Sequence, residues 1–251
     1  MLIAWTSPLT WPPAHVALGG VLYFATLYLA FAGLSWGLTR GLLPALKLGR
    51  VLDPRPLGAH QVRRELWQSS GSVLIFGVGL LVPWGLLQMG WAAVTLQASG
   101  ARVLAEVAVL LLWNDVHFYA HHRLLHHPRL FRHFHLPHHR SVVTTPWSTY
   151  AFHPVEALML GSVLIVPMVV WPFSLTALAL LPVLSLAYNS VGHANYQALP
   201  QSWRWLSNAK GHHLHHACFR GNYGFLFSFM DRGLGTQLPS DAADEVIRLG
   251  L

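Results

Sequence analysis

Three long stretches without a charged side chain are the strongest constraint on how this 251-residue chain can fold. No Asp, Glu, Lys or Arg occurs in residues 1–39, 66–101 or 157–203. A helix crosses the hydrocarbon core of a bilayer in about 20 apolar residues, because the core is about 30 Å thick. The first two stretches can each hold one such helix, and the third can hold two. The sequence therefore predicts an integral membrane protein.

The composition argues against both a soluble and a disordered chain. Charged residues make up 10% of the chain and hydrophobic residues 53%, whereas soluble domains carry about 25% charged residues. A water-soluble enzyme would lack the polar surface it needs, and a disordered chain would contain far fewer apolar residues. The single cysteine, Cys218, excludes a disulfide framework and a Cys-rich metal site.

The apolar runs predict an all-α fold in one domain that covers residues 1–251, with four or five membrane spans. The spans are expected at about residues 15–39, 71–96, 103–121, 155–170 and 175–192. Pro83 should kink the second span or form the turn of a re-entrant hairpin.

The basic residues predict the orientation of the chain. Lys and Arg gather in segments 40–64, 123–140 and 204–232, whereas the opposite loops hold only Arg102. With five spans these basic segments all lie on one side, and the positive-inside rule makes that side cytoplasmic. The net charge of +7 therefore indicates membrane topology, and we expect no nucleic-acid partner.

Histidine is unusually frequent: the chain has 17, and fifteen of them lie between His117 and His216. The pattern His-x-x-His-His occurs twice, and side chains at positions i, i+3 and i+4 share one face of a helix. His122 and His126 form a similar pair, and His193 follows the last span. We expect a histidine-rich helical cap over residues 121–153 and 193–236. The candidate metal ligands are His122, His126, His135, His138, His139, His193, His212, His215 and His216.

The ligand type narrows the choice of metal. Imidazoles without thiolates suit iron, zinc or copper and argue against calcium or magnesium. Nine histidines are too many for one ion and indicate two. Asp115 lies about two helical turns before His122 and should orient that ring through its other nitrogen. Seven of the eight other histidines are expected to be structural: His15, His60, His117, His121, His127, His133 and His213.

These motifs occur in an order that resembles the fatty acid hydroxylase/sterol desaturase superfamily of integral-membrane di-iron enzymes. The resemblance covers about residues 115–236 and includes His122-Arg-x-x-His-His-Pro, His135-x-Pro-His-His, Gly192-His-x-Asn-Tyr and His212-x-x-His-His. The run from His122 to Glu156 is most similar to sterol desaturases of the lathosterol oxidase type. Known fatty acid hydroxylases carry a second histidine shortly after the one matching His193, and here Gln197 stands near that place. One metal is therefore expected to have a different ligand or a water.

The resemblance implies two iron ions held by the nine histidines, with O₂ as co-substrate and with zinc as a substitute in purified protein. It implies no catalytic residue separate from these ligands. It places five further residues around them: Asp115, Tyr119, His153, Glu156 and Asn195. The implied reaction is hydroxylation or desaturation of an unactivated C–H bond in a lipid-like substrate such as a sterol, a fatty acyl chain or an isoprenoid. The sequence does not distinguish these substrates, the two reactions, or a bacterial inner membrane from an ER membrane.

An external electron donor is also expected, either a ferredoxin or a b-type cytochrome with its reductase. The chain carries neither a G-x-G-x-x-G turn after a strand nor a haem-attachment motif. Basic residues near the histidines suit an acidic carrier.

Three other classes of membrane protein fit these motifs less well. A single-zinc membrane hydrolase acting on a lipid would use about three histidines and leave most of the set idle. A metal transporter would place ionisable ligands in the middle of its spans. A non-catalytic metal-binding membrane protein has no reason to repeat the His-x-x-His-His spacing.

Overall fold

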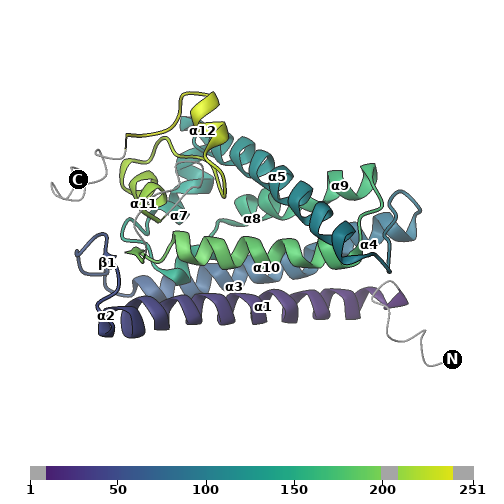
Figure 1. Ribbon diagram of the computed structural model, residues 1–251, viewed down its shortest axis with the longest axis horizontal. Coiled ribbons are helices and arrows are strands. Elements are labelled where there is room, and N and C mark those ends of the chain that lie inside the picture. Colours follow the sequence, from purple (N-terminus) through teal and green to yellow (C-terminus); the bar gives the residue numbers. More distant parts are fainter. Residues whose placement is uncertain (1–9, 199–208, 240–251) are drawn as a thin grey trace.

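The structure, a computed structural model, describes residues 10–198 and 209–239. Its long helices lie along one direction, with α1, α3 and α10 side by side and α5 running obliquely across them (Figure 1). The membrane helices and their connections are α1 (Pro13–Gly37), η2 (Leu38–Leu42), α2 (Leu43–Ala45), α3 (Gln61–Gly79), α4 (Leu81–Gln88), α5 (Gly100–Leu125), α8 (Pro154–Gly161), η5 (Ser162–Leu164), α9 (Ile165–Val170) and α10 (Leu175–Gly192). The other elements are β1 (Arg50–Val51), α6 (Pro128–Leu130), η3 (Phe131–His135), α7 (Leu136–His139), η4 (Pro146–Tyr150), β2 (Tyr196–Gln197), α11 (Ala209–Cys218) and α12 (Phe229–Gly233).

The all-α fold predicted from the sequence is confirmed, with four helical segments long and apolar enough to cross a membrane. These are Pro13–Ala45, Gln61–Gln88, Gly100–Leu125 and Leu175–Gly192. The fifth predicted span, 155–170, corresponds to the shorter apolar segment Pro154–Val170, which η5 interrupts. Four of the predicted spans therefore have full spanning length, and the fifth is shorter.

The short segment α8–α9 nevertheless returns the chain to the end of the bundle where α10 begins (Figure 1). There the N–H of Thr95 donates to the carbonyl of Phe173, and the N–H of Leu175 donates to the carbonyl of Thr95. The loops before α5 and before α10 thus share one end of the molecule. The segments that follow α1, α5 and α10 share the other end, as the five-span prediction required.

The second span begins about ten residues earlier than the predicted 71–96. The prediction excluded the charged residues near position 64, yet Glu65 is fully buried within α3. It accepts hydrogen bonds from the side chains of Gln61, Ser141 and Thr145, which offset the cost of burying a carboxylate. The helix is interrupted at Leu80, three residues before Pro83, so this proline kinks the span.

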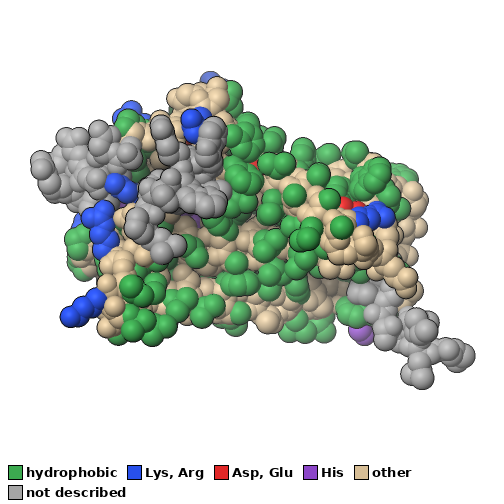
Figure 2. Space-filling model, viewed as in Figure 1, with side chains coloured by type: hydrophobic (Ala, Val, Ile, Leu, Met, Phe, Trp, Pro, Cys, Tyr) green, Lys and Arg blue, Asp and Glu red, His purple; other side chains and the backbone are tan. Residues whose placement is uncertain are grey.

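Two clusters of apolar side chains hold the spans together. Helices α1 and α3 approach closely at Gly20 and Gly77, where a Cβ atom on either residue would collide with the backbone of the other helix. A second cluster joins Leu110 of α5 to Leu181 of α10. The outer surface is apolar: Leu104, for example, is 72% exposed, and hydrophobic side chains cover the length of the bundle (Figure 2). This surface suits a lipid environment.

The end of the bundle opposite the start of α1 carries most of the Lys and Arg on the visible face (Figure 2). Here β1 pairs antiparallel with β2, Arg50 opposite Gln197 and Val51 opposite Tyr196. This pairing ties the segment after the first span to the segment after the last. Residues 199–208 of the predicted cap lie outside the described residues.

Candidate metal centre

Four parts of the chain bring the candidate ligands to one place. Helix α5 carries His122 in its last turn and His126 as its C-cap, and His193 is the C-cap of α10. The second histidine box starts in the π-helical turn η3 and continues into α7, where Pro137 stands at the helix start, as its missing N–H favours. The last box lies on α11.

All nine predicted ligands gather into two groups. Within each group the ring nitrogens that could bind an ion lie within 4.8 Å of one another. The five-histidine group consists of His122, His126, His135, His139 and His215. The four-histidine group consists of His138, His193, His212 and His216. In the described part of the chain, the seven histidines predicted to be structural join neither group.

The two His-x-x-His-His boxes divide between the groups in a reciprocal way. His135 and His139, spaced i and i+4, enter the five-histidine group, whereas His138 enters the other. In the second box the i and i+4 pair enters the four-histidine group, and His215 crosses to the five-histidine group. Consecutive helix positions point about 100° apart, and positions i and i+4 share a face. Each box therefore contributes to both groups.

Backbone carbonyls fix the tautomer of four rings. In each ring Nδ1–H donates to a carbonyl oxygen, so Nε2 carries a lone pair directed into the site. The pairs and their distances are His122 to Tyr223 (2.9 Å), His126 to Phe219 (3.0 Å), His215 to Gly221 (2.6 Å) and His193 to Asn189 (3.0 Å).

This arrangement tests whether the residues fit a metal ion. The Nε2 atoms of His126 and His215 are 3.2 Å apart, and neither carries a proton when its Nδ1–H is donated. Burial lowers the pKa of both rings well below the ordinary value, which keeps them neutral. Two lone pairs facing each other at this distance repel, and a cation bound between them removes the repulsion. The nitrogen set suits a transition metal.

The four-histidine group repeats these contacts. The Nε2 atom of His212 lies 3.0 Å from that of His193 and 3.2 Å from that of His216. His138 approaches His193 at 3.5 Å. Burial lowers the pKa of His193 to about 4. Gln197, which the resemblance places near the position of a further histidine, bonds Arg50 instead: its Oε1 accepts a hydrogen bond from the Arg50 side chain at 3.3 Å.

Asp115 does not orient His122 as predicted. Its Oδ1 accepts hydrogen bonds from the backbone N–H groups of Leu226 and Phe227. The loop that contains them also supplies the Tyr223 carbonyl that holds His122. Asp115 therefore anchors the loop that orients the ligand. The sequence spacing could not reveal this, because the loop lies about 100 residues away along the chain.

The other four residues predicted around the ligands have different roles. The carboxylate of Glu156 lies 2.9 Å from Nδ1 of His135, so it does contact a candidate ligand. Tyr119 bonds Thr236 through its hydroxyl. His153 accepts the N–H of Val155 and caps α8. Asn195 bonds both backbone groups of Asp53 and holds the β1 segment in place.

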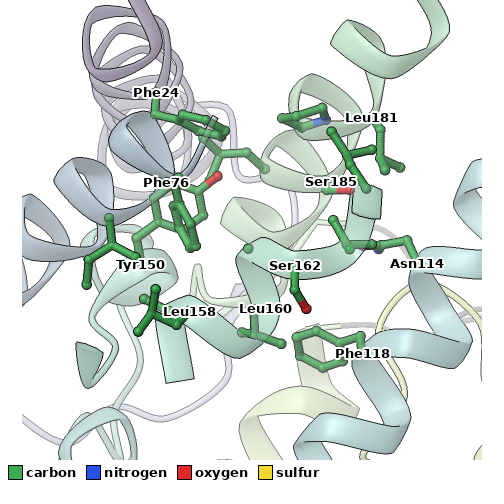
Figure 3. Close-up of a pocket in the computed structure, with 18 of the residues that line it drawn as sticks. Phe24, Phe76, Asn114, Phe118, Tyr150, Leu158, Leu160, Ser162, Leu181 and Ser185 are labelled. Atoms are coloured by element: carbon green, nitrogen blue, oxygen red, sulfur yellow. The ribbon is translucent and has the colours of Figure 1, made fainter. Parts of the chain in front are cut away.

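A cavity of about 290 Å³ lies between the membrane helices (Figure 3). Its walls are mostly apolar, and the polar side chains that also line it are Asn114, Ser162, Ser185 and Asn189. Leu158 and Val82 line it and are 60% and 51% exposed on the lipid-facing surface, so the cavity opens sideways toward the bilayer. No motif in the sequence indicated this cavity, because its lining comes from six separate segments.

Two aromatic side chains at the inner end of the cavity separate it from the histidines. The ring of Phe118 lies 5.0 Å from that of His122, and the ring of Phe152 lies 5.0 Å from that of His138. A small adjoining gap is lined by His212, and it shares Phe118 with the main cavity. A group at this end of the cavity would therefore lie against Phe118 and Phe152, each of which packs on one of the two histidine groups.

Comparison with known proteins decides the family. Residues 107–236, just over half of the chain, match the fatty acid hydroxylase family. The chain belongs to the fatty acid hydroxylase family. The chain is also similar to sterol desaturases of the lathosterol oxidase type, as the sequence predicted.

Three curated relatives illustrate the similarity. A Delta(7)-sterol 5(6)-desaturase of Leptosphaeria maculans is 27% identical over 88% of this chain and 61% of its own length. A Delta(7)-sterol 5(6)-desaturase of Gibberella zeae is 31% identical over 76% of this chain and 61% of its own length. The lathosterol oxidase of Rattus norvegicus is 32% identical over 52% of this chain and 44% of its own length. The chain thus spans about half to two thirds of these relatives. No solved structure gives a significant match.

Proposed function

We propose that this protein is a membrane-bound di-iron oxidase that uses O₂ to hydroxylate or desaturate an unactivated C–H bond of a lipid. One observation carries the proposal: two convergent groups of neutral histidines stand at the inner end of an apolar cavity that opens toward the bilayer. The printed names of the relatives, sterol desaturases and a lathosterol oxidase, support an oxidoreductase with a lipid substrate.

The five-histidine group would hold one iron and the four-histidine group the other. When bound, the iron pair supplies the oxidising power that removes hydrogen from a C–H bond. The chain's own residues hold the rings in one tautomer, exclude water through burial and present a bound lipid end-on. The carbonyls of Tyr223, Phe219 and Gly221 fix the rings of the five-histidine group, and Glu156 lies against His135. Phe118 and Phe152 form the apolar wall between substrate and ligands.

A single-zinc hydrolase is less consistent with this site. Catalytic zinc is usually held by three protein ligands and keeps one open position. Each histidine group here exceeds that number, and the two groups interlock through shared boxes.

We further propose that the histidine end faces the cytoplasm and receives electrons from a separate carrier. Arg129, Arg132, Arg140 and Arg220 lie near the centre in sequence and would attract an acidic ferredoxin or cytochrome. Purified protein supplied with O₂ and lipid should stay inactive until a carrier and its reductase are added, and the restored rate should fall as salt rises. Sustained turnover with O₂ and NAD(P)H alone would contradict the need for a carrier.

The decisive test is metal analysis combined with lipid profiling. Two irons per chain, and lipids that gain about 16 Da or lose about 2 Da in the presence of O₂ and reductant, would support the oxidase. One zinc per chain with lipid hydrolysis would overturn it. Replacing His138 by Ala should abolish oxidation, whereas replacing His60, which lies outside both groups, should not. Full activity and full iron content in the His138→Ala protein would contradict the ligand assignment.

A further inference from the structure

Two polar side chains interrupt the apolar cavity at the same level. Asn114 of α5 and Ser185 of α10 both line it (Figure 3). One turn earlier on each helix, Leu110 and Leu181 pack in the same apolar cluster. One turn later, Phe118 and Asn189 both line the main cavity and the small gap at His212. The two helices are therefore in register, and Asn114 and Ser185 form one rung of this ladder.

This rung lies near the middle of both membrane spans. Asn114 precedes His122 by eight residues, and Ser185 precedes His193 by the same number, which is about 12 Å along a helix axis. Polar side chains at this depth are expensive unless they bond each other or serve a ligand. In many membrane proteins, Ser and Asn bond across a helix interface.

That structural role is not realised here. The hydroxyl of Ser185 is buried and bonds no group in the described part of the chain, neither on α5 nor on the preceding turn of α10. An unpaired buried hydroxyl costs about 1–3 kcal/mol. A ligand that enters the cavity and bonds this hydroxyl removes the cost.

The rest of the lining defines the ligand's chemistry. No charged side chain lines the cavity in the described residues, so a carboxylate or phosphate would be buried without a counter-charge. The side chains of Asn and Ser can each donate and accept a hydrogen bond, and a hydroxyl group matches both. We propose that Asn114 and Ser185 bind the hydroxyl group of a neutral lipid alcohol. This assignment rests on the proposed function for the view that the alcohol is the substrate.

The depth of this rung gives the pair a role in positioning. With its hydroxyl bonded to Asn114 and Ser185, the lipid extends past Phe118 toward the histidines. The carbon that reaches the metal centre is then one that lies about 12 Å from the hydroxyl. The pair thereby selects both the class of lipid and the place where it is oxidised.

Competitive photolabelling tests the binding without requiring turnover. The probe is a tetradecanol with a mid-chain diazirine, and the competitors are unlabelled 1-tetradecanol and tetradecane. Purified protein in detergent is irradiated, and adducts are counted by intact mass. Partition into the micelle is the same for every variant, so the ratio of the two competitors' potencies, compared between variants, reports on the cavity alone.

In the wild-type protein, the alcohol's advantage over the hydrocarbon should exceed that in the Ser185→Ala and Asn114→Leu proteins by about three- to tenfold, the value of one hydrogen bond. Ser190→Ala is the matched control. It removes a buried hydroxyl from the same helix that does not line the cavity, and its ratio should equal that of the wild type.

Equal ratios in all four proteins would overturn the inference and would leave a bridging water as the partner of Ser185. If the protein oxidises lipids but all four proteins show the same ratio of competitor potencies, this inference is overturned and the proposed function stands. If the protein binds no iron and oxidises no lipid, but the ratio still differs between the wild type and the two cavity variants, the proposed function is overturned and this inference stands.

Discussion

The five-histidine and four-histidine groups are built from the same residue type, but the surrounding chain holds them differently. In the five-histidine group, the carbonyls of residues 219–223 fix three rings, and Glu156 lies against a fourth. In the four-histidine group, Asn189 fixes His193, while the buried Nδ1 of His216 has no hydrogen-bond partner among the described residues, as is also the case for Nδ1 of His139 in the five-histidine group. The four-histidine group also borders the gap beside the cavity at His212. We infer a rigidly held group and a more open group that faces the substrate.

The largest expected effect is the loss of one ligand from either group. His215→Ala and His212→Ala should each lower turnover by about a hundredfold or more, since removing groups that merely support ligands already costs about 10–100-fold. Metal content should fall from two ions per chain toward one. Metal analysis and oxidation assays provide the measurement, and His60→Ala serves as the control. Retention of both ions in either variant would remove that histidine from the ligand set.

Removing the carboxylate beside His135 should affect the more rigid group selectively. Glu156→Gln keeps the size of the side chain but removes its charge, and metal affinity of the five-histidine group should fall about 10–100-fold. His153→Ala is the matched control, because His153 caps the same helix without contacting a ligand. Competition with a metallochromic chelator measures the affinities. Equal losses in the two variants would mean that Glu156 acts only through the fold.

A single methyl group should disturb the loop that holds His215. Gly221 has a φ of +65°, and a Cβ atom there would lie 2.6 Å from the Leu238 side chain. Gly221→Ala should therefore cost about 1–3 kcal/mol in the free energy of unfolding and should weaken metal binding in the five-histidine group. Gly90→Ala provides the comparison, since Gly90 has a φ of +72° with no atom nearby. Thermal unfolding with and without metal separates strain alone from strain that shifts the Gly221 carbonyl.

The smallest expected effect is a difference in the rate of metal loss. A chelator should remove the two ions in two phases that differ several-fold, because rings without fixed partners release an ion more readily. The slow phase should be absent in His215→Ala and the fast phase absent in His212→Ala. A single phase in the wild-type protein would show that the two groups are held equally well.

The sequence predicted the nine histidines because their spacing is local. Positions i, i+3 and i+4 have a fixed relation on any helix, so the boxes were recognisable before their partners were known. The division into two groups follows the same spacing: the i, i+4 pair His135 and His139 lies in one group, and the i, i+4 pair His212 and His216 lies in the other. It could not be read from the sequence alone, since the side on which each box packs depends on the tertiary structure.

The failures have a common physical cause. The role of Asp115, the buried position of Glu65 and the carbonyls of residues 219–223 all depend on contacts between segments distant in the chain. The early start of the second span at Gln61 was missed because charge was taken to exclude a residue from the bundle. Side-chain hydrogen bonds from Ser141 and Thr145 make Glu65 acceptable there.

The pairing of β1 with β2 has a consequence for how the protein is made. It closes only when residues 196–197 can meet residues 50–51, and the four-histidine group needs a helix that begins at Ala209. During synthesis the first three spans therefore enter the membrane while their histidines have no partners. Under the proposed function we infer that metal loading would follow insertion of the last span, because each histidine group includes residues from both sides of that span in the sequence.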